Sequence, residues 1–332
     1  MRSILVIQTA FIGDVVLATA LLESLHKAYP QASIDIAVRK GNESMFRGHP
    51  FLRNVLIWDK QQAKYRHLIA LLKEIRQNKY SLVLNLQRYA ATGFLTVFSG
   101  AETTIGFDKN PFHPLFTHSI SHQMGTDGTG GHETVRNQRL IQPLTSLPAD
   151  KPALYPSPED HAYTAQWKQS PYICIAPTSV WFTKQFPAAK WVEFLNSLPA
   201  DLQVYLLGGP GDRGVCDQIM TETTHKQCMN LAGQCNFLQS ASLMRDALMN
   251  YVNDSAPMHF CSSVNAPVTV VYCSTVPAFG YGPLSDNSRI IETTEPMSCR
   301  PCGLHGRKAC PLGHFNCANS IAISQLTAAL PA

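Results

Sequence analysis

Glycine, carboxylate and hydroxyl groups gather in the turn formed by residues 8–14 of this 332-residue chain. Gly13 lets the backbone approach a ligand closely, and a carboxylate such as Asp14 in this turn can act as a general base. The structural alternative is that Asp14 caps the helix that follows. The turn lacks the G-x-G-x-x-G pattern, which disfavours a nicotinamide-dependent oxidoreductase.

A second turn, residues 176–187, carries two adjacent hydroxyls and an ammonium group, those of Thr178, Ser179 and Lys184. Hydroxyls and ammonium groups are what a phosphate oxyanion needs for hydrogen bonds and charge neutralisation. The alternative is a polar loop with a solvated lysine.

Two further turns hold carboxylates next to predicted helix starts. Asp212 follows a run of glycines and is expected either to bind a ribose hydroxyl or to cap its helix. Asp254 and Ser255 precede Pro257, so free N–H groups of the next helix would form an anion site. Asp254 would repel a phosphate there unless it binds sugar hydroxyls. His259 lies one turn on from Ser255 and would reach the same ligand, or else face the core.

Taken together, these turns predict a layout. The three turns in the second half of the chain converge where a nucleotide diphosphate would bind, and Asp14 faces them from the first half.

Four cysteines lie within nineteen residues near the end of the chain: Cys299, Cys302, Cys310 and Cys317. In a cytosolic protein such a cluster suggests a metal before disulfides, although the spacing is not that of a standard zinc finger. Structural zinc, disulfides and reduced thiols that shape an acceptor loop all remain open. The other six cysteines are predicted to be small core residues: Cys174, Cys216, Cys228, Cys235, Cys261 and Cys273.

The elements that must position these side chains alternate between strand and helix. Strands are predicted at 3–7, 33–38, 54–58, 81–86, 172–176, 204–207 and 268–273, and helices at 15–29, 62–77, 132–144, 188–198, 212–222 and 238–249. Residues 100–131 lack a periodic pattern and are predicted to be irregular. The proline-rich stretch 143–160 is the best linker candidate, and the two domains are expected to join near residues 143–171. The sequence therefore predicts α/β architecture with two Rossmann-like domains, residues 1–155 and 156–332.

Composition narrows the class of protein. The chain is 45% hydrophobic and 15% charged, which excludes disordered and fibrous proteins, and its net charge of +4 is too small to indicate a nucleic-acid binder. Asp14 interrupts the apolar N-terminus, which reads as a strand and helix and not as a signal peptide, and no membrane-spanning stretch appears. We therefore expect a cytoplasmic protein.

Four segments in order give the chain a specific resemblance: IGDVVLATALLESL, PTSVWFTKQFPAAKW, LLGGPGD and NDSAPMHFCSSVNAPVTVVY. The chain resembles the heptosyltransferases of lipopolysaccharide core synthesis, glycosyltransferase family nine, over nearly its whole length. The resemblance implies the GT-B fold, with an N-terminal acceptor-binding domain and a C-terminal domain that binds the nucleotide sugar.

The resemblance also implies residue roles. Asp14 corresponds to the base that deprotonates the acceptor hydroxyl for an inverting displacement on an ADP-linked sugar. Thr178, Ser179 and Lys184 would hold the donor diphosphate, and Asp254 the sugar hydroxyls. The remaining donor-binding residues would be Asp212 at the ribose and Ser255, Ala256 and His259 near the phosphates.

Two departures from the family pattern concern the donor. Gln8 stands where relatives often carry lysine, and Ser255-Ala256 replaces a Thr/Ser-Gly pair, so a different nucleotide sugar is an alternative. A catalytically inactive relative is a second alternative. No D-x-D motif occurs, and the resemblance implies transfer that needs no metal cofactor.

The acceptor implied by the resemblance is an anionic saccharide on a lipid carrier. Basic residues of the first domain would form its landing site, with Arg39, Lys40 and Arg88 as the main candidates and Arg47 and Arg53 beside them. A scattered solvated face is the alternative. We expect a monomer in peripheral contact with the inner membrane surface, and no nucleic-acid partner.

Overall fold

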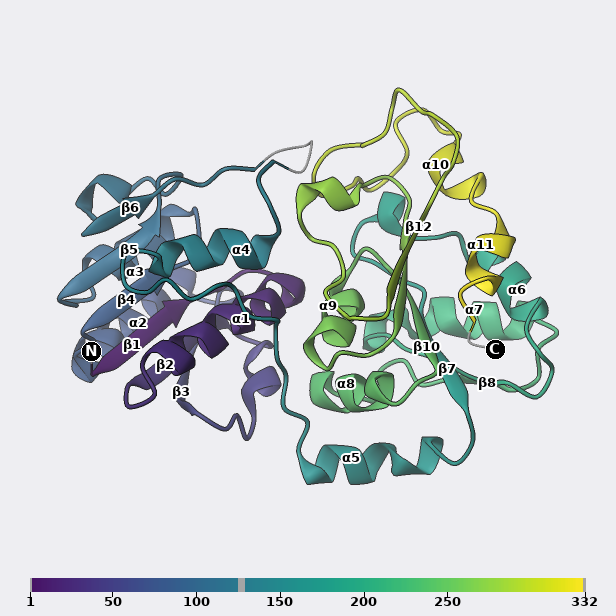
Figure 1. The fold of residues 1–332 in the computed structure, drawn as a ribbon, viewed down its shortest axis with the longest axis horizontal. Coiled ribbons are helices and arrows are strands. Elements are labelled where there is room, and N and C mark those ends of the chain that lie inside the picture. The colour runs from purple at the N-terminus through teal and green to yellow at the C-terminus, as the bar shows by residue number, and fades with distance from the viewer. Residues whose placement is uncertain (1, 125–128, 331–332) are drawn as a thin grey trace. The chain divides into compact units, whose positions relative to one another are not determined.

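The computed structural model describes residues 2–124 and 129–330. The chain forms two compact units, Met1–Tyr155 and Pro156–Ala332, each built on its own six-stranded parallel sheet. Helices flank each sheet (Figure 1), which confirms the predicted α/β architecture. In the described part of the chain, no helix is long and apolar enough to cross a membrane.

The sheet of unit 1 has the order β3-β2-β1-β4-β5-β6. Its strands are β1 (Ser3–Ile7), β2 (Ser33–Arg39), β3 (Leu52–Trp58), β4 (Leu82–Asn85), β5 (Thr103–Phe107) and β6 (His118–Ile120). The helices are α1 (Ile12–Ala28), α2 (Lys64–Asn78), α3 (Ala90–Val97) and α4 (Glu133–Gln138), with 3-10 turns η1 (Glu43–Phe46), η2 (His113–Leu115) and η3 (Arg139–Ile141).

The sheet of unit 2 has the order β12-β11-β10-β7-β8-β9, which repeats that of unit 1. Its strands are β7 (Tyr172–Ala176), β8 (Gln203–Leu206), β9 (Cys228–Asn230), β10 (Met249–Asn253), β11 (Val268–Tyr272) and β12 (Ser288–Glu292). Its helices are α5 (Pro158–Thr164), α6 (Ala188–Asn196), α7 (Arg213–Glu222), α8 (Phe237–Arg245), α9 (Ala256–Ser263), α10 (Asn316–Asn319) and α11 (Ile323–Thr327). The 3-10 turns of this unit are η4 (Ala165–Trp167), η5 (Phe182–Lys184), η6 (Pro210–Asp212) and η7 (Pro277–Phe279).

Helix α1 is buried along most of its length. Every residue from Val15 to Leu22 is buried, so the helix is apolar on nearly all sides. Such a helix needs cover on both faces, and α4 packs against it. The start of α1 is thereby held firmly at the end of β1.

Two predictions of local structure are wrong. Residues 100–131 contain β5 and β6, and the predicted helix 238–249 ends at Arg245, after which β10 begins. The polar residues of these strands concealed them. Asn250 in β10 is fully buried and donates to the carbonyls of Met244 (2.9 Å) and Pro267 (2.8 Å), which makes a central strand compatible with an amide side chain.

Candidate functional site

Each sheet has one point at which the strand order reverses direction. In unit 1 it lies between β1 and β4, and in unit 2 between β7 and β10. Open parallel sheets bind ligands outside the carboxyl ends of their strands at such a point. Asp14 follows β1, whereas Lys184 and Asp254 follow β7 and β10, so the predicted residues lie at these points.

Asp14 is the third residue of α1, in the first helical turn, and is half-buried. The helix begins at Ile12 and its N-cap is Phe11, so the alternative that Asp14 is the N-cap is wrong. A carboxylate in the first turn is stabilised by the helix dipole, which favours its ionised, proton-accepting form.

Glu133 and Arg136, which the sequence analysis did not single out, form a buried pair beside Asp14. Arg136 donates to Glu133 Oε2 from Nε (2.8 Å) and from Nη2 (2.7 Å), and both residues are buried. Burial raises the pKa of Glu133, Arg136 opposes the increase, and the charge of Asp14 adds to it. Asp14 is therefore close enough to Glu133 for the two carboxylates to repel. The sequence signal that could have identified this pair is the H-E-x-x-R motif at the start of the predicted helix 132–144.

A second group of cations lies over the turn that precedes α1. The guanidinium of Arg39 stands 5.0 Å from the centre of the exposed Phe11 ring. Lys60, another residue that was not predicted, donates from Nζ to the Thr9 carbonyl (2.7 Å). Burial lowers the pKa of Lys60 to about 8, assisted by the charges of Arg39 and Lys64.

Arg88 opens a third cationic region at the ends of β4, β5 and β6. One pocket is lined by Arg88, Tyr89, Lys109, His122, Gln123 and Met124. Burial lowers the pKa of His122 to about 4, and the charges of Arg88 and Arg136 add to the decrease. His122 is consequently neutral at pH 7. The positive charge of the pocket comes from Arg88 and Lys109.

The other predicted basic residues are less uniform. Lys40 is exposed and pairs with Asp59 (2.8 Å), and Arg47 is exposed just after η1. Arg53 lies at the opposite edge of the sheet, near the start of β3, where it pairs with the buried Asp35 (2.6 Å). Its predicted place in the landing site is therefore wrong, because it anchors the amino ends of two strands.

In unit 2, Lys184 and Asp254 are brought into direct contact. Lys184 Nζ lies 2.8 Å from Asp254 Oδ2, and the same oxygen accepts a hydrogen bond from the Thr275 hydroxyl (2.6 Å). Asp254 and Thr275 are buried. Because β10 lies between β7 and β11, residues at the three strand ends meet around one carboxylate. Thr275 was not predicted.

Asn253, the last residue of β10, bonds to both ends of the turn that follows β7 and carries Lys184. Its Oδ1 accepts from the Phe186 N–H (2.9 Å) and its Nδ2 donates to the Thr178 carbonyl (3.3 Å). Gln185 Nε2 donates to the Ser179 carbonyl (2.6 Å). Thr178 and Ser179 are half-buried, and these bonds fix the backbone from which their hydroxyls project.

Helix α9 begins directly after Asp254. Ser255 is its N-cap, Ala256 is its first residue and Pro257 stands in the first turn, as predicted. His259 is 5% exposed, in agreement with the core-facing alternative, and its contact with a ligand stays a prediction. Asp212 Oδ2 accepts from the Gly209 N–H (2.7 Å) in the turn after β8, while its ribose role also stays a prediction.

Comparison with known proteins assigns the family. Residues 68–308 match the domain described as glycosyltransferase family 9 (heptosyltransferase). The chain belongs to this family. Lipopolysaccharide heptosyltransferase 3 of Escherichia coli is 27% identical over 299 residues, which cover 83% of this chain and 85% of that protein.

Two solved structures share the GT-B fold of this family 9 glycosyltransferase. The family 9 glycosyltransferase from Veillonella parvula DSM 2008 is 20% identical with a TM-score of 0.86, covering 99% of this chain and 96% of that one. The E. coli heptosyltransferase WaaC, solved with ADP, is 16% identical with a TM-score of 0.75, and 98% of each chain is covered.

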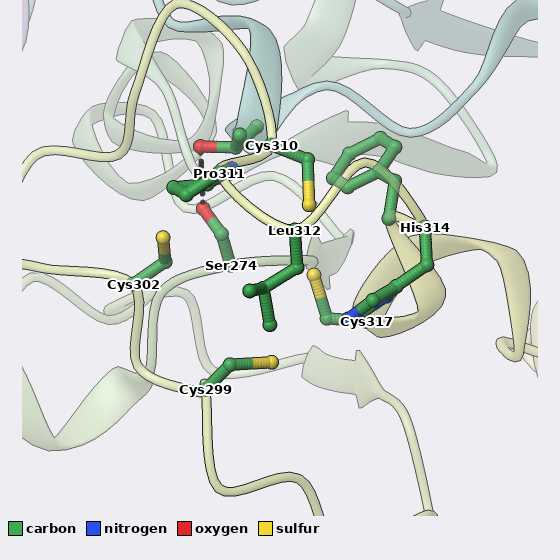
Figure 2. Close-up of a pocket in the computed structure, with 10 residues that line it drawn as sticks. Ser274, Cys299, Cys302, Cys310, Pro311, Leu312, His314 and Cys317 are labelled. Atoms are coloured by element: carbon green, nitrogen blue, oxygen red, sulfur yellow. Dashed lines mark hydrogen bonds between the residues drawn. The ribbon is translucent and has the colours of Figure 1, made fainter.

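The ten cysteines of this glycosyltransferase are all free. Of the six predicted core thiols, Cys174, Cys216, Cys261 and Cys273 are buried, whereas Cys228 and Cys235 are half-buried. The other four line a single pocket in unit 2 (Figure 2). Among the described residues, no three His, Cys, Asp or Glu side chains lie close enough in this conformation to hold a metal ion.

Proposed function

We propose that this family 9 glycosyltransferase moves a heptose from ADP-heptose to a hydroxyl of an anionic glycolipid of the lipopolysaccharide core, with inversion and without a metal cofactor. The observation that carries the proposal is the division of charge between the two units. Unit 1 has the Asp14 carboxylate at its strand-order reversal, and unit 2 has the Lys184–Asp254 pair at the corresponding point.

Unit 1 supplies the base and the acceptor surface. The Asp14 carboxylate takes the proton of the acceptor hydroxyl while that oxygen forms a bond to the anomeric carbon. The buried Arg136 neutralises Glu133, which limits the repulsion that Glu133 exerts on Asp14. The cations at the strand ends (Arg39, Lys60, Arg88 and Lys109) would bind acceptor phosphates or carboxylates.

Unit 2 binds the donor and stabilises the leaving group. As the new bond forms on one face of the anomeric carbon, the bond to the diphosphate oxygen breaks on the other, and its electron pair leaves with ADP. The Lys184 ammonium, the hydroxyls of Thr178 and Ser179 and the N–H groups at the start of α9 would stabilise the growing charge on the diphosphate. Asp254 would accept hydrogen bonds from the sugar hydroxyls.

Relatives support the choice of donor and acceptor. Several curated relatives are named as heptosyltransferases of lipopolysaccharide or lipooligosaccharide, and WaaC was solved with ADP. Ala256 at the start of α9 carries a methyl group close to where we place the diphosphate, so the nucleotide must be tested. Contact with the inner membrane surface would follow from the cationic acceptor surface of unit 1.

Nucleotide binding can be tested on the purified chain by thermal shift with ADP, UDP, GDP, CMP and NAD. A ligand that binds only the folded state stabilises it by about 2.7 kcal/mol at a hundredfold excess over Kd. We expect ADP to give the largest shift. A larger shift with another nucleotide would indicate that the donor sugar is linked to that nucleotide and not to ADP. No shift with any of them would favour a catalytically inactive relative.

Transfer itself is tested with ADP-heptose and glycolipid from cells that lack core heptose. We expect one heptose to be added to the glycolipid as ADP is released, with the opposite anomeric configuration to the donor by NMR. A product with retained configuration would contradict the direct displacement by the acceptor hydroxyl.

A further inference from the structure

The cysteine segment, residues 299–317, folds around one pocket at the end of the sheet in unit 2. The pocket is lined by Cys299, Cys302, Cys310, Cys317 and His314, together with Thr183 and Ser274 (Figure 2). Four thiols therefore approach one cavity from two stretches of chain, residues 299–302 and 310–317. Cysteines that serve only as core residues gain nothing from this convergence, and none of them is joined in a disulfide.

Cys310 begins a tight turn that borders the pocket. The Gly313 N–H donates to the Cys310 carbonyl (3.1 Å). Gly313 adopts a φ of +75°, a left-handed conformation that glycine reaches at little steric cost. The turn therefore places Cys310 and His314 on the lining of the pocket that also contains Cys299, Cys302 and Cys317.

The other three cysteines line the same pocket. Cys317 is 7% exposed and lies within electrostatic range of Cys299, Cys302 and Cys310. The guanidinium of Arg300 is engaged elsewhere, with Glu292 Oε2 (2.6 Å) and with the carbonyls of Cys273 and Thr275 (2.8 Å each). The thiols thus line one pocket, and the neighbouring Arg300 guanidinium is bonded to a carboxylate and to two backbone carbonyls.

The cysteine segment also contacts the donor turn. Buried Thr183 accepts from the Arg307 N–H (2.8 Å) and the Ser274 hydroxyl (3.0 Å), and its own N–H donates to the Arg307 carbonyl (3.1 Å). The Cys302 N–H donates to the Ser274 carbonyl (2.8 Å). A Cβ placed on Gly306 would lie 2.9 Å from Lys184 Cγ, so the segment packs directly on the lysine.

We propose that the four cysteines bind one thiophilic divalent metal ion, with Zn²⁺ as the expected occupant, and that the bound ion fixes the turn that positions Lys184. Four thiolates are the ligand set of closed structural zinc sites. Among the described residues no three such side chains are placed to hold a metal ion in the present conformation, so binding would require the cysteine side chains to rotate toward the ion. As each sulfur–zinc bond forms, its thiol proton passes to solvent.

The site is tested by metal analysis of the full chain, purified under reducing conditions from zinc-supplemented cells. We expect about one Zn²⁺ per chain, as for a single four-thiolate site. Cys310→Ser and Cys317→Ser should lose the metal, whereas Cys235→Ser, a half-buried thiol of the same unit, should keep it. Iron at the same stoichiometry would also support the site.

Cobalt titration of the wild-type chain tests the site without the serine variants, in case one of them fails to fold. A single saturating Co²⁺ with a thiolate-to-cobalt charge-transfer band supports the site. A wild-type chain with neither bound metal nor this band overturns it, as do disulfides among the four cysteines in the freshly purified, unreduced protein.

The positioning role is tested by hydrogen exchange of residues 178–187 with and without the metal. We expect faster exchange in the metal-free chain, while β8 (Gln203–Leu206) exchanges as before. Unchanged exchange of 178–187 would overturn this role. None of these three measurements requires a donor, so a failure here is distinct from a failure of the proposed transferase activity.

Discussion

The carboxyl edges of the two sheets share one strand order but carry different kinds of loops. In unit 1, cations stand at successive strand ends, some of them exposed, around the half-buried Asp14. In unit 2, buried side chains join the strand ends to one another: Asn253 bonds the end of β10 to the turn after β7, and Asp254 lies between Lys184 and Thr275. The same strand order thus carries exposed cations in unit 1 and a site of buried, mutually bonded side chains in unit 2.

The comparison suggests a division of labour. An anionic acceptor of variable shape is best met by spaced cations, because charge attraction tolerates variation in position. A diphosphate leaving group needs donors held in place before the reaction, because reorganisation at that moment would reduce the stabilisation. The predictions below test whether chemistry, donor binding and acceptor binding separate in this way.

The largest effect is expected for Asp14→Asn. Loss of the base should lower kcat/KM by roughly 10³-fold, within the range of general-base catalysis, while ADP affinity stays unchanged. Transfer rates and calorimetric ADP binding measure the two quantities. Asp201→Asn, the same change at an exposed position of unit 2, is the control. Retained turnover in the Asp14 variant would show that Asp14 is not the catalytic base.

Lys184→Met is expected to weaken both folding and donor binding. It leaves the buried Asp254 with the Thr275 hydroxyl but no cation, which costs about 3 kcal/mol of unfolding free energy. Urea denaturation measures this loss, and calorimetry should show weaker ADP binding.

The double variant Lys184→Met/Asp254→Asn separates the two effects. It should regain most of the lost stability without regaining ADP affinity, because the uncompensated charge is gone but so is the ammonium. Full ADP affinity in either variant would show that Lys184 does not contact the diphosphate.

Acid should destabilise unit 1 through His122. Its folded pKa of about 4 lies below its ordinary 6.5, so the unfolded chain binds more protons and stability falls as the pH drops from about 6.5 to about 4. After allowance for solvent screening, the loss is about 1–2 kcal/mol. Between pH 7 and pH 4.5, the unfolding free energy of the His122→Asn variant should fall by that much less than that of the wild type. Urea denaturation at the two pH values measures the difference.

The matched control for this pH dependence is His118→Asn, an exposed histidine of β6. We expect its stability to follow the wild type across the same pH range. An unchanged slope in the His122 variant would mean that the pocket holds a protonated imidazole.

The smallest effect is expected for Arg88→Ala. Removal of one cation from this pocket should raise the acceptor KM by about 3- to 10-fold with little change in kcat. It should also make the acceptor KM less dependent on salt concentration. Initial rates at two ionic strengths measure both. Arg66→Ala on the exposed face of α2 is the control, and equal effects of the two variants would contradict a localised acceptor surface.

Local sequence patterns predicted most of the elements and their turns. β1 and β7 are short apolar runs that are buried on both faces, and such runs identify a central parallel strand without knowledge of its neighbours. Asp14 and Lys184 could be found for the same reason, since each follows such a strand, whereas Asp254 was found from the helix start that Pro257 indicates. β10 was missed because Asn250 looks polar until its partners at Met244 and Pro267 are known.

The sequence by itself determined which residues stand at strand ends, because that depends on periods of a few residues. Only the tertiary structure decided which strand ends meet. Parallel pairing brings Lys184 to Asp254 and places Arg53 at the opposite edge beside Asp35, while the packing of α4 on α1 brings Glu133 close to Asp14. These partners are separated by between 18 and more than 100 residues, so no local pattern records them, and the charge of each side chain acquires its role only from the neighbour that folding supplies.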